Sequence, residues 1–465
     1  MIRLLERAAA AVPDQPAVVT AEATTTYAGL LASAQAVGAG LRERGIDRFA
    51  VVEADAARVL ALLAGAALVG AEPCQYQPDI DAAQFREQAG ALGHTVVVSR
   101  RDDLAGDGLV VLAPDDLAAD APAPPSGGAD GDGDAEDEQP ILIRTTGTTG
   151  LPKAARHDWS VLARTTRDAK PRPGQRWLLA YGPQQFAGIQ VLQHVLAIQG
   201  TLVAPFPRQP RDGLEALLTQ QLDCVSATPT YWRFLLAEAR SRGVALPPLV
   251  QVTLGGEASS PDLLADLRAA LPDARISQVY ASTEFGSIAS VGDGRPGLSV
   301  ASLWSEDNPD GLLRVVDGQL WVRSGTGMSG YAGDRSDTPV EEDGWVPTGD
   351  LAEVVEDRVL FRGRNSEVIN VGGVKVHPLP VEERISALPE VSMARVFGRP
   401  NRLTGAIVAV EIVPTGDPGA VDAGDLRRAV RQAVADLPSA WHPRSVSVVT
   451  DLETRGSKTV RGMAD

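Results

Sequence analysis

The chain has 465 residues, of which 44% are hydrophobic and 22% charged, and this apolar content argues against global disorder. Since a chain of this length exceeds one compact core of the usual size, we expect a large domain and a smaller one. The net charge of -17 disfavours nucleic-acid binding, because phosphate backbones attract basic surfaces, and no apolar run is long enough to span a bilayer.

The first residues and the cysteines bear on the cellular compartment. The opening MIRLLERAAAAVPDQP carries Glu6 and Arg7 where a secretory signal needs an unbroken apolar run, which predicts a cytoplasmic protein. The only cysteines, Cys74 and Cys224, lie far apart in the chain, without the spacing of a zinc site. We therefore expect two buried, unreactive thiols.

Apolar residues at helical spacing from Leu30 to Leu41 predict a helix that ends before Gly45. A buried strand, 49–53, and a helix, 58–69, follow. The acidic stretch 121–140, APAPPSGGADGDGDAEDEQP, then predicts a solvated linker. A metal-binding acidic loop is the alternative, although the Gly and Glu pattern of a calcium loop is missing.

After the acidic stretch, short apolar runs alternate with helical patterns. The runs are residues 141–144, 177–181, 201–205, 223–227 and 249–254. Such alternation predicts a largely parallel sheet covered by helices. Ligands of these sheets collect at the carboxyl ends of the strands, so we expect the chemistry in the loops that follow them.

From about Ala301 the pattern changes to short strands separated by glycine-rich turns, which predicts a small antiparallel β unit. Beyond Arg364, strand-like and helical segments are sufficient for a separate α+β domain. We therefore predict an α/β fold with a large N-terminal domain, residues 1–365, and a small C-terminal domain, residues 366–465.

The run Thr-Thr-Gly-Thr-Thr-Gly-Leu-Pro-Lys directly follows the apolar strand 141–144 and is typical of a phosphate-binding loop. Glycines let the backbone approach an anion, threonine hydroxyls donate hydrogen bonds, and a lysine adds positive charge. The sequence Leu151-Pro152 excludes a Walker A loop. A flexible turn ending in a surface lysine is the structural alternative. The candidate phosphate ligands are Thr145, Thr146, Gly147, Thr148, Thr149, Gly150 and Lys153.

This loop resembles the phosphate-loop signature of the adenylate-forming (ANL) superfamily: acyl- and aryl-CoA ligases, nonribosomal peptide adenylation domains and luciferases. Six further segments resemble family signatures in the expected order: 254–260, 279–286, 330–334, 344–351, 363–383 and 454–462. The resemblance implies a large N-terminal domain, a small mobile C-terminal domain, and ATP with Mg²⁺ bound between them.

The resemblance also implies roles for single residues. Tyr280 would stack on adenine, Thr283 would bind the α-phosphate, and Glu284 would hold Mg²⁺. Asp350 would bind the ribose hydroxyls, with Arg364 nearby. The adenine-facing wall would include Gly255, Gly256 and Glu257. Ordinary turns and solvated strand ends are the alternatives for these positions.

Lys458 is the residue that the resemblance makes most diagnostic. Its ammonium would reach from the small domain to the α-phosphate and the acid carboxylate, so the implied catalytic set is Lys458, Thr283 and Glu284. A frayed basic tail is the alternative. Two positions depart from the family pattern: Gly456-Ser457 reverses the usual Ser-Gly order, and Ser366 occupies a hinge position that is commonly Asp or Lys.

The acid pocket would include Tyr181, Phe186, Gly188 and Ala281, although Phe186 is equally a core candidate, and Gly372 and Gly373 would border a thiol tunnel. We predict activation of an aryl or medium acyl acid as acyl-AMP with release of pyrophosphate. The acyl group would then pass to CoA or to the phosphopantetheine of an acyl carrier protein. Two alternatives stay open: a diazotase that activates nitrite in secondary metabolism, and a nucleotide-binding member that does not adenylate.

Overall fold

The computed structural model describes residues 1–117, 139–145, 153–204, 209–332, 343–415 and 422–452, with the short pieces 454–455, 458–459 and 461. Most of the predicted acidic linker lies outside these residues. The predicted end of this linker, residue 140, is wrong by at least one residue, because Pro140 is already the first residue of a β-strand, Pro140–Arg144.

An eight-stranded sheet forms one half of the large domain, in the order β14-β13-β12-β11-β9-β10-β1-β2. Its central neighbours are parallel, as the alternating pattern predicts, and only the outer pairs β13–β14 and β1–β2 are antiparallel. The strands are β1 (Pro16–Val19), β2 (Thr24–Thr26), β9 (Arg176–Leu179), β10 (Thr201–Val203), β11 (Cys224–Ala227), β12 (Gln251–Gly255), β13 (Arg275–Ser282) and β14 (Gly286–Val291).

A seven-stranded sheet forms the other half, in the order β18-β8-β7-β4-β3-β5-β6. The run that precedes the phosphate loop is β7, which pairs antiparallel with β8 and parallel with β4, so this part of the sheet is mixed. The strands are β3 (Arg48–Val52), β4 (Glu72–Gln75), β5 (Val96–Ser99), β6 (Val110–Leu112), β7 (Pro140–Arg144), β8 (Ala154–Asp158) and β18 (Gly330–Tyr331).

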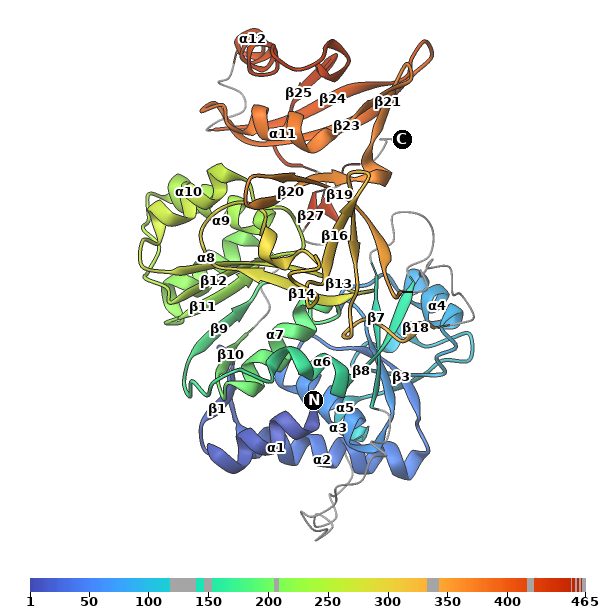
Figure 1. The fold of residues 1–465 in the computed structure, drawn as a ribbon. Helices are drawn as coiled ribbons and strands as arrows, with labels where there is room; N and C mark the ends of the chain where they lie inside the picture. Colours follow the sequence, from blue (N-terminus) through green and yellow to red (C-terminus); the bar gives the residue numbers. More distant parts are fainter. Residues whose placement is uncertain are drawn as a thin grey trace.

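Helices fill the space between these sheets and cover their outer faces (Figure 1). One large apolar cluster joins α1, α2, α3 and α7 to strands of both sheets, and another packs α8, α9 and α10 on the outer face of the eight-stranded sheet. The helices are α1 (Ile2–Ala11), α2 (Tyr27–Arg44), α3 (Ala56–Val69), α4 (Ala82–Ala91), α5 (Pro114–Leu117), α6 (Trp159–Leu162), α7 (Phe186–Ala197), α8 (Pro210–Thr219), α9 (Pro229–Arg242) and α10 (Pro261–Ala270).

Local signals set the ends and the packing of these helices. Thr26 caps α2 by accepting a hydrogen bond from the amide of Gly29, and Gly45 ends the helix in the left-handed region at φ 61°. On α3, a Cβ at Gly65 would lie 2.6 Å from the carbonyl oxygen of Ala34. The close contact between α2 and α3 therefore requires a glycine at this position.

The predicted antiparallel β unit is a five-stranded sheet in the order β15-β20-β19-β17-β16. Its strands are β15 (Leu298–Ser299), β16 (Leu313–Val316), β17 (Gln319–Val322), β19 (Val346–Val355) and β20 (Arg358–Arg364). Strand β20 ends at Arg364, and the 3₁₀ turn η4 (Asn365–Glu367) contains Ser366.

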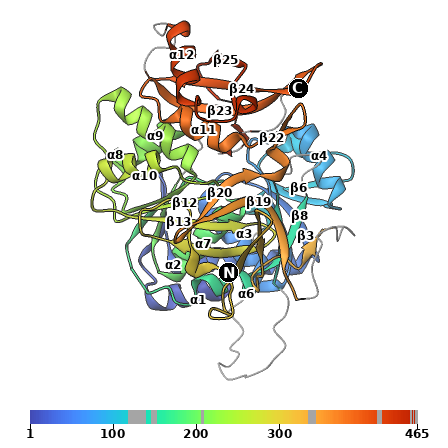
Figure 2. The same ribbon diagram turned by 45° about the horizontal axis from the view of Figure 1, so that its top comes forward.

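The C-terminal part forms its own sheet, β22-β21-β24-β23 with β25 beside β24, and its own apolar cluster with two helices. Figures 1 and 2 show this part, in orange and red, stacked on the β19–β20 side of the large domain. The predicted α/β class with a large and a small domain is confirmed, and the boundary at residue 365 stays a prediction. The elements are β21 (Ile369–Val371), β22 (Val374–Val376), α11 (Pro378–Ser386), β23 (Val391–Asn401), β24 (Gly405–Pro414), α12 (Ala423–Ala433) and β25 (Ser445–Val448).

The chain closes with a short hairpin of β26 (Thr454–Arg455) and β27 (Lys458–Thr459). Figure 1 shows β27 level with β19 and β20, below the C-terminal sheet. Strand β27 contacts α9 of the large domain. The chain thus returns from the small domain to the large one.

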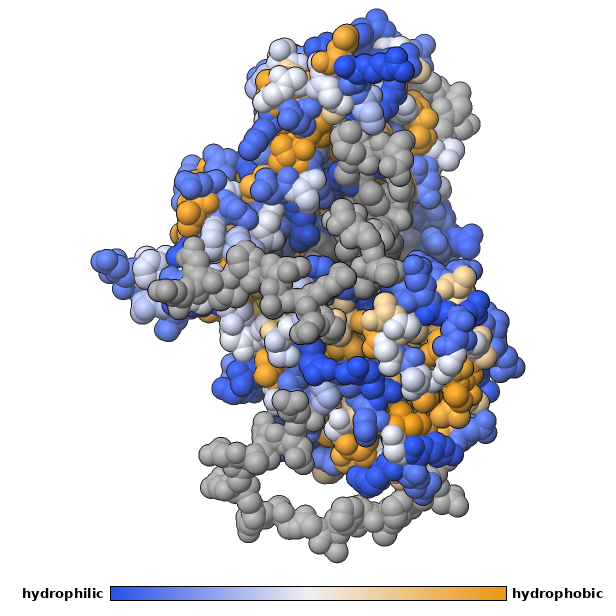
Figure 3. Space-filling model, turned by 90° about the vertical axis from the view of Figure 1, so that its right-hand side faces the viewer, coloured by the Kyte–Doolittle hydropathy of each residue, from blue (hydrophilic) through white to orange (hydrophobic). Residues whose placement is uncertain are grey.

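Among the residues that the structure describes, no helix is long and apolar enough to cross a membrane. The described surface on the face seen in Figure 3 is mostly hydrophilic, with separate apolar areas.

Candidate active site

Five predicted site residues of the large domain lie where the parallel strands β12 and β13 end. Gly255, the last residue of β12, pairs with Val279 of β13. The loop with Gly256 and Glu257 follows β12, and the loop with Thr283 and Glu284 follows β13. Carboxyl ends of neighbouring parallel strands lie at one edge of a sheet, so the topology brings these loops together.

Tyr280 and Asp350 form the tightest contact between predicted nucleotide ligands. The Tyr280 hydroxyl donates to Oδ2 of Asp350 at 2.7 Å, and Arg364 Nε donates to Oδ1 at 2.9 Å. The Tyr280 ring packs against Phe361, with 5.1 Å between ring centroids. Burial, ahead of the charge of Asp350, raises the pKa of Tyr280 well above its usual value, so the phenol stays a hydrogen-bond donor. An aromatic face, a carboxylate and a guanidinium are thereby held in one cluster.

A second cluster joins the candidate magnesium ligand to the phosphate-loop lysine. The Tyr331 hydroxyl donates to Oε1 of Glu284 at 3.3 Å, and Lys153 Nζ lies 4.8 Å from the centroid of the Tyr331 ring. Burial, followed by the nearby charge of Glu284, raises the pKa of Tyr331 to about 12. A tyrosine that the sequence analysis did not select therefore links the two polar groups predicted to meet phosphates and metal.

The phosphate loop is described only at its two ends. The amide of Thr145 donates to the carbonyl oxygen of Lys153 at 2.8 Å, which closes the β7–β8 hairpin around the loop. Five of the candidate phosphate ligands lie outside the described residues: Thr146, Gly147, Thr148, Thr149 and Gly150.

His157 is a buried site residue that the sequence analysis missed. Its Nε2 lies 2.7 Å from the carbonyl oxygen of Thr283, and its ring centroid lies 5.6 Å from that of Phe186. Burial lowers the pKa of His157 to about 4, although the hydrogen bond to Thr283 opposes this shift. Because a carbonyl can only accept, the neutral ring carries its hydrogen on Nε2. His157 thus ties β8, which follows Lys153, to the loop that carries Thr283.

One of the predicted acid-pocket residues, Phe186, contacts His157. Tyr181, Phe186 and Ala281 belong to or pack against the same apolar cluster, and the Tyr181 hydroxyl donates to the carbonyl oxygen of Gly255 at 3.2 Å. Gly188 has a packing reason of its own, because a Cβ there would lie 2.3 Å from the carbonyl oxygen of Gly182. Tyr181, a predicted acid-pocket residue, is therefore in direct contact with Gly255, a predicted residue of the adenine wall.

The two remaining residues of the adenine wall differ in setting. Gly256 has φ 85°, a backbone conformation that favours glycine. Glu257 accepts a hydrogen bond from the amide of Thr230 in the first turn of α9, at 3.0 Å. A carboxylate at a helix N-terminus is stabilised by the exposed amides, so Glu257 faces α9 through this contact.

The C-terminal candidates are placed less fully. Lys458 lies in β27, where its backbone pairs with Arg455, and β27 contacts α9. Gly372 and Gly373 lie at the exposed tip of the β21–β22 hairpin, with φ 58° and 90°. The amide of Gly372 donates to the carbonyl oxygen of Thr404, within the small domain. The described contacts do not bring these glycines to the strand-end cluster.

The residues present fit a magnesium ion held mainly by phosphates. No group of three or more His, Cys, Asp or Glu side chains among the described residues forms a metal site. Mg²⁺ commonly takes one or two carboxylates together with substrate phosphates and water. Glu284, which contacts Tyr331 as Lys153 does, would supply one such carboxylate for a metal that arrives with a nucleotide.

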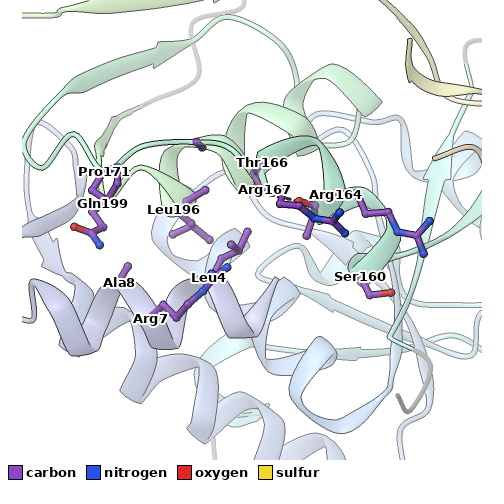
Figure 4. A pocket seen from close by; sticks show the side chains of 13 residues that line it. Leu4, Arg7, Ala8, Ser160, Arg164, Thr166, Arg167, Pro171, Leu196 and Gln199 are labelled. Atoms are coloured by element: carbon purple, nitrogen blue, oxygen red, sulfur yellow. Dashed lines mark hydrogen bonds between the residues drawn. The ribbon is translucent and has the colours of Figure 1, made fainter. Parts of the chain in front are cut away.

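A separate cavity lies away from these residues. It measures about 390 Å³ and is lined by residues of α1, the segment 160–171 and the end of α7, including Arg7, Arg164 and Arg167. Figure 4 shows Arg7 on α1 and Arg167 on a different wall of this cavity. It includes none of the predicted site residues.

The two predicted thiols, Cys74 and Cys224, are both free and buried, as expected. Burial raises the pKa of each to about 12, which keeps them protonated and unreactive. The residues that sequence reasoning missed, His157, Tyr331 and Phe361, carry no motif by themselves. A weak signal existed for Tyr331, because it lies within the segment 330–334 that resembles a family signature.

Comparison with known proteins identifies the family. The model of the AMP-binding enzyme family matches residues 5–332, and that of the AMP-binding enzyme C-terminal domain matches residues 380–458. The chain is 28% identical over 366 residues to the fatty acid–[acyl-carrier-protein] ligase MmaC of Mycobacterium marinum, which covers 70% of this chain and 67% of that protein.

Solved structures share the fold over nearly the whole chain. The anthranilate CoA ligase AuaEII, in complex with anthranoyl-AMP, has a TM-score of 0.82 at 18% identity, covering 99% of this chain and 95% of that one. The o-succinylbenzoate CoA synthetase MenE of Bacillus subtilis, in complex with ATP and a magnesium ion, has a TM-score of 0.75 at 20% identity, covering 98% of both chains. With its family matches, its fold and its clustered nucleotide-type residues, the chain belongs to the AMP-binding enzyme family and is an acyl-AMP-forming ligase of the adenylate-forming superfamily.

Proposed function

We propose that this enzyme uses ATP and Mg²⁺ to activate an aryl or medium-chain acyl acid and then transfers the acyl group to a thiol, of CoA or of a carrier-protein phosphopantetheine. The observation that carries the proposal is that two clusters of polar residues lie near the carboxyl end of strand β13. Tyr280, Asp350 and Arg364 suit a nucleoside, and Lys153 and Glu284 suit its phosphates and metal.

In the first step, a carboxylate oxygen attacks the α-phosphorus, and the bond between the α-phosphorus and the bridging oxygen breaks as pyrophosphate leaves. Asp350 binds the ribose hydroxyls and the Tyr280 ring packs on adenine, so the α-phosphate is held near Thr283. The approach of one anion to another builds up negative charge, which Lys153 and Lys458 offset. Glu284 would hold Mg²⁺, which neutralises the departing phosphates.

The acid is proposed to lie against the apolar cluster that contains Tyr181, Phe186 and Ala281. Their shared packing favours an uncharged, apolar acid body. The neutral ring of His157 beside Phe186 adds no charge. The acids named for two similar proteins, a fatty acid for MmaC and anthranilate for AuaEII, belong to the two acid classes proposed here.

The thiol step needs a path for a thin pantetheine chain, and Gly372 and Gly373 are proposed to border it. Their lack of side chains and their exposure on the β21–β22 hairpin suit such a role. MmaC is a carrier-protein ligase by name and AuaEII a CoA ligase, so both acceptors belong in the proposal. The proposal also includes a cytoplasmic location and a domain boundary near residue 365.

The decisive experiment measures pyrophosphate release from ATP and Mg²⁺ with aryl acids, fatty acids, amino acids and nitrite, comparing the native protein with Lys458→Ala. Release with one acid class that is lost in Lys458→Ala supports the proposal and names the class. Release with nitrite alone would favour the diazotase alternative. ATP binding without release on any acid would favour the alternative that does not adenylate.

A further inference from the structure

Arg461, beyond the last strand of the chain, makes a two-pronged ion pair inside the small domain. Its Nε lies 3.0 and 2.9 Å from the two carboxylate oxygens of Glu382, and its Nη2 lies 2.6 Å from Oε1. The two side chains are only 16% and 9% exposed. A buried fork of this kind fixes both distance and orientation, which a single-point contact cannot do.

The receiving carboxylate is itself held in place. Glu382 lies on α11, and its Oε2 also accepts a hydrogen bond from the amide of Val396 on β23, at 3.1 Å. Through Glu382, Arg461 is therefore linked to two elements of the small domain, helix α11 and the edge strand β23. The contacts of Glu382 with Arg461 and Val396 thus fix the place of Arg461 in the small domain.

The pair also lies where the two domains meet. A small hollow there is lined by Arg233, Glu257 and Ser260 of the large domain and by Glu382 and Arg461 of the small one. Burial alone would lower the pKa of Arg461, but Glu382, ahead of Glu257 and Glu367, raises it, so the guanidinium stays charged. The negative charge of Glu257 thus favours the charged guanidinium from across the domain interface.

The hairpin β26–β27 immediately precedes this anchor. Lys458 pairs with Arg455 across the hairpin, and Arg461 follows β27 after one intervening residue. On its other side, β27 contacts α9, whose first turn binds Glu257. The hairpin is therefore bounded by α9 of the large domain and by the Arg461–Glu382 pair of the small one.

We propose that Arg461 is a positioning residue for acid activation: its ion pair with Glu382 holds the β26–β27 hairpin against the large domain so that Lys458 is presented to the reacting phosphate. The proposal rests on the role of Lys458 proposed above. Because Lys458 serves the attack on ATP, the pair acts in the first half-reaction and not in the transfer from acyl-AMP to a thiol.

The test separates the two half-reactions in the full chain. Arg461→Ala should lower kcat for pyrophosphate release by about 10- to 100-fold, as expected for the loss of a charge-assisted contact, with the KM for ATP within about threefold. Transfer from a chemically prepared acyl-AMP to the thiol should stay within about twofold of the native rate. Arg461→Lys keeps the charge but loses the two-point contact. Its kcat for pyrophosphate release should therefore lie between those of the native enzyme and of Arg461→Ala.

A matched control is available on the same helix. Arg384 of α11 pairs with Asp436, but both side chains are more than half exposed, at 52% and 61%. Arg384→Ala should leave both half-reactions unchanged, because exposed pairs contribute little. Melting curves of all variants identify any that fail to fold. Glu382→Gln disrupts the same ion pair from the carboxylate side and provides a second test.

Equal losses in both half-reactions for Arg461→Ala and Glu382→Gln would overturn the proposal, as would a rise in the KM for ATP at unchanged kcat. Either result would make the pair a general support of the fold or of nucleotide binding. Failure of the proposed function is recognised separately, because the native enzyme itself would then release no pyrophosphate with any of the acids.

Discussion

The hydroxyl of Tyr280 donates to Asp350 at 2.7 Å, so a hydrogen bond joins the ring proposed for adenine to the carboxylate proposed for ribose. The carboxylate is also held by Arg364 on its other oxygen. A ligand site whose polar groups already have their orientation loses less free energy to ordering when the ligand arrives.

Asp350→Asn should raise the KM for ATP by about 10- to 100-fold, because the charge-assisted contacts to the ribose hydroxyls are weakened. Tyr280→Phe keeps the aromatic face and should cost less than about fivefold, since only one hydrogen bond is lost. Steady-state kinetics with varied ATP measure both. Asp357→Asn, which alters an exposed Asp–Arg pair with Arg295 in the same sheet, is the control and should have no effect. An equal effect of Asp357→Asn would indicate that only the sheet had been weakened.

Glu284→Gln should increase the Mg²⁺ concentration for half-maximal pyrophosphate release by about tenfold or more, because a neutral amide is a weaker ligand for a hard cation. Titration of Mg²⁺ at saturating ATP measures the change. The exposed Glu306 gives the matched variant Glu306→Gln, which should titrate like the native enzyme. An unchanged Mg²⁺ titration for Glu284→Gln would remove Glu284 from the metal site.

His157→Leu should lower kcat for pyrophosphate release more than it changes the KM for ATP. The variant loses the hydrogen bond to the Thr283 carbonyl, made at 2.7 Å, which fixes the loop meant to hold the α-phosphate. His157→Gln keeps an N–H donor of similar reach and should recover part of kcat. The kcat of the Gln variant should exceed that of the Leu variant by about 10-fold. Identical kinetics of the Leu and Gln variants would show that the hydrogen bond does not matter.

The stability of the fold should fall as the pH drops from 7 to 5. Burial lowers the pKa of His94 and of His157 to about 4, whereas an unfolded histidine titrates near 6.5. Within this window the unfolded chain binds more protons than the folded one, so protonation favours unfolding. Each histidine contributes on the order of 2 kcal/mol, and most carboxylates stay ionised above pH 5.

Denaturant unfolding at pH 7, 6 and 5 measures this slope. His94→Phe removes one of several groups whose pKa burial lowers, among them His157, His194 and the N-terminal amine, and it also removes two buried ring nitrogens without a hydrogen-bond partner. The variant should reduce the stability change between pH 7 and pH 5 by on the order of 2 kcal/mol. A slope equal to that of the native protein would mean that His94 takes up its proton without unfolding.

Gly188→Ala should destabilise the protein by roughly 1–3 kcal/mol, because its Cβ would lie 2.3 Å from the carbonyl oxygen of Gly182 and the start of α7 would have to shift. Gly90 in α4 is the matched control, since a Cβ there meets nothing within 4 Å. Gly90→Ala should be neutral or stabilising by up to about 1 kcal/mol. Thermal melts compare the two variants, and equal melting temperatures would contradict the packing argument.

The order of the main elements and the family could both be predicted from the sequence. Alternating apolar runs predict parallel strands with their ligands at one edge, and β9 to β13 follow that plan because buried strands need apolar residues on both faces. Motifs such as VYASTEFG keep their chemistry within a few neighbouring residues, so Tyr280, Thr283 and Glu284 could be selected without a structure.

Only the tertiary structure decided which distant residues serve those motifs. His157 reaches Thr283, Tyr331 reaches Glu284, and Arg461 reaches Glu382 across 126, 47 and 79 residues of sequence. A single histidine, tyrosine or arginine carries no periodicity or spacing that would reveal its partner. Such pairs depend on how sheets and domains pack, because a hydrogen bond or an ion pair forms only when folding brings two side chains within about 3 Å.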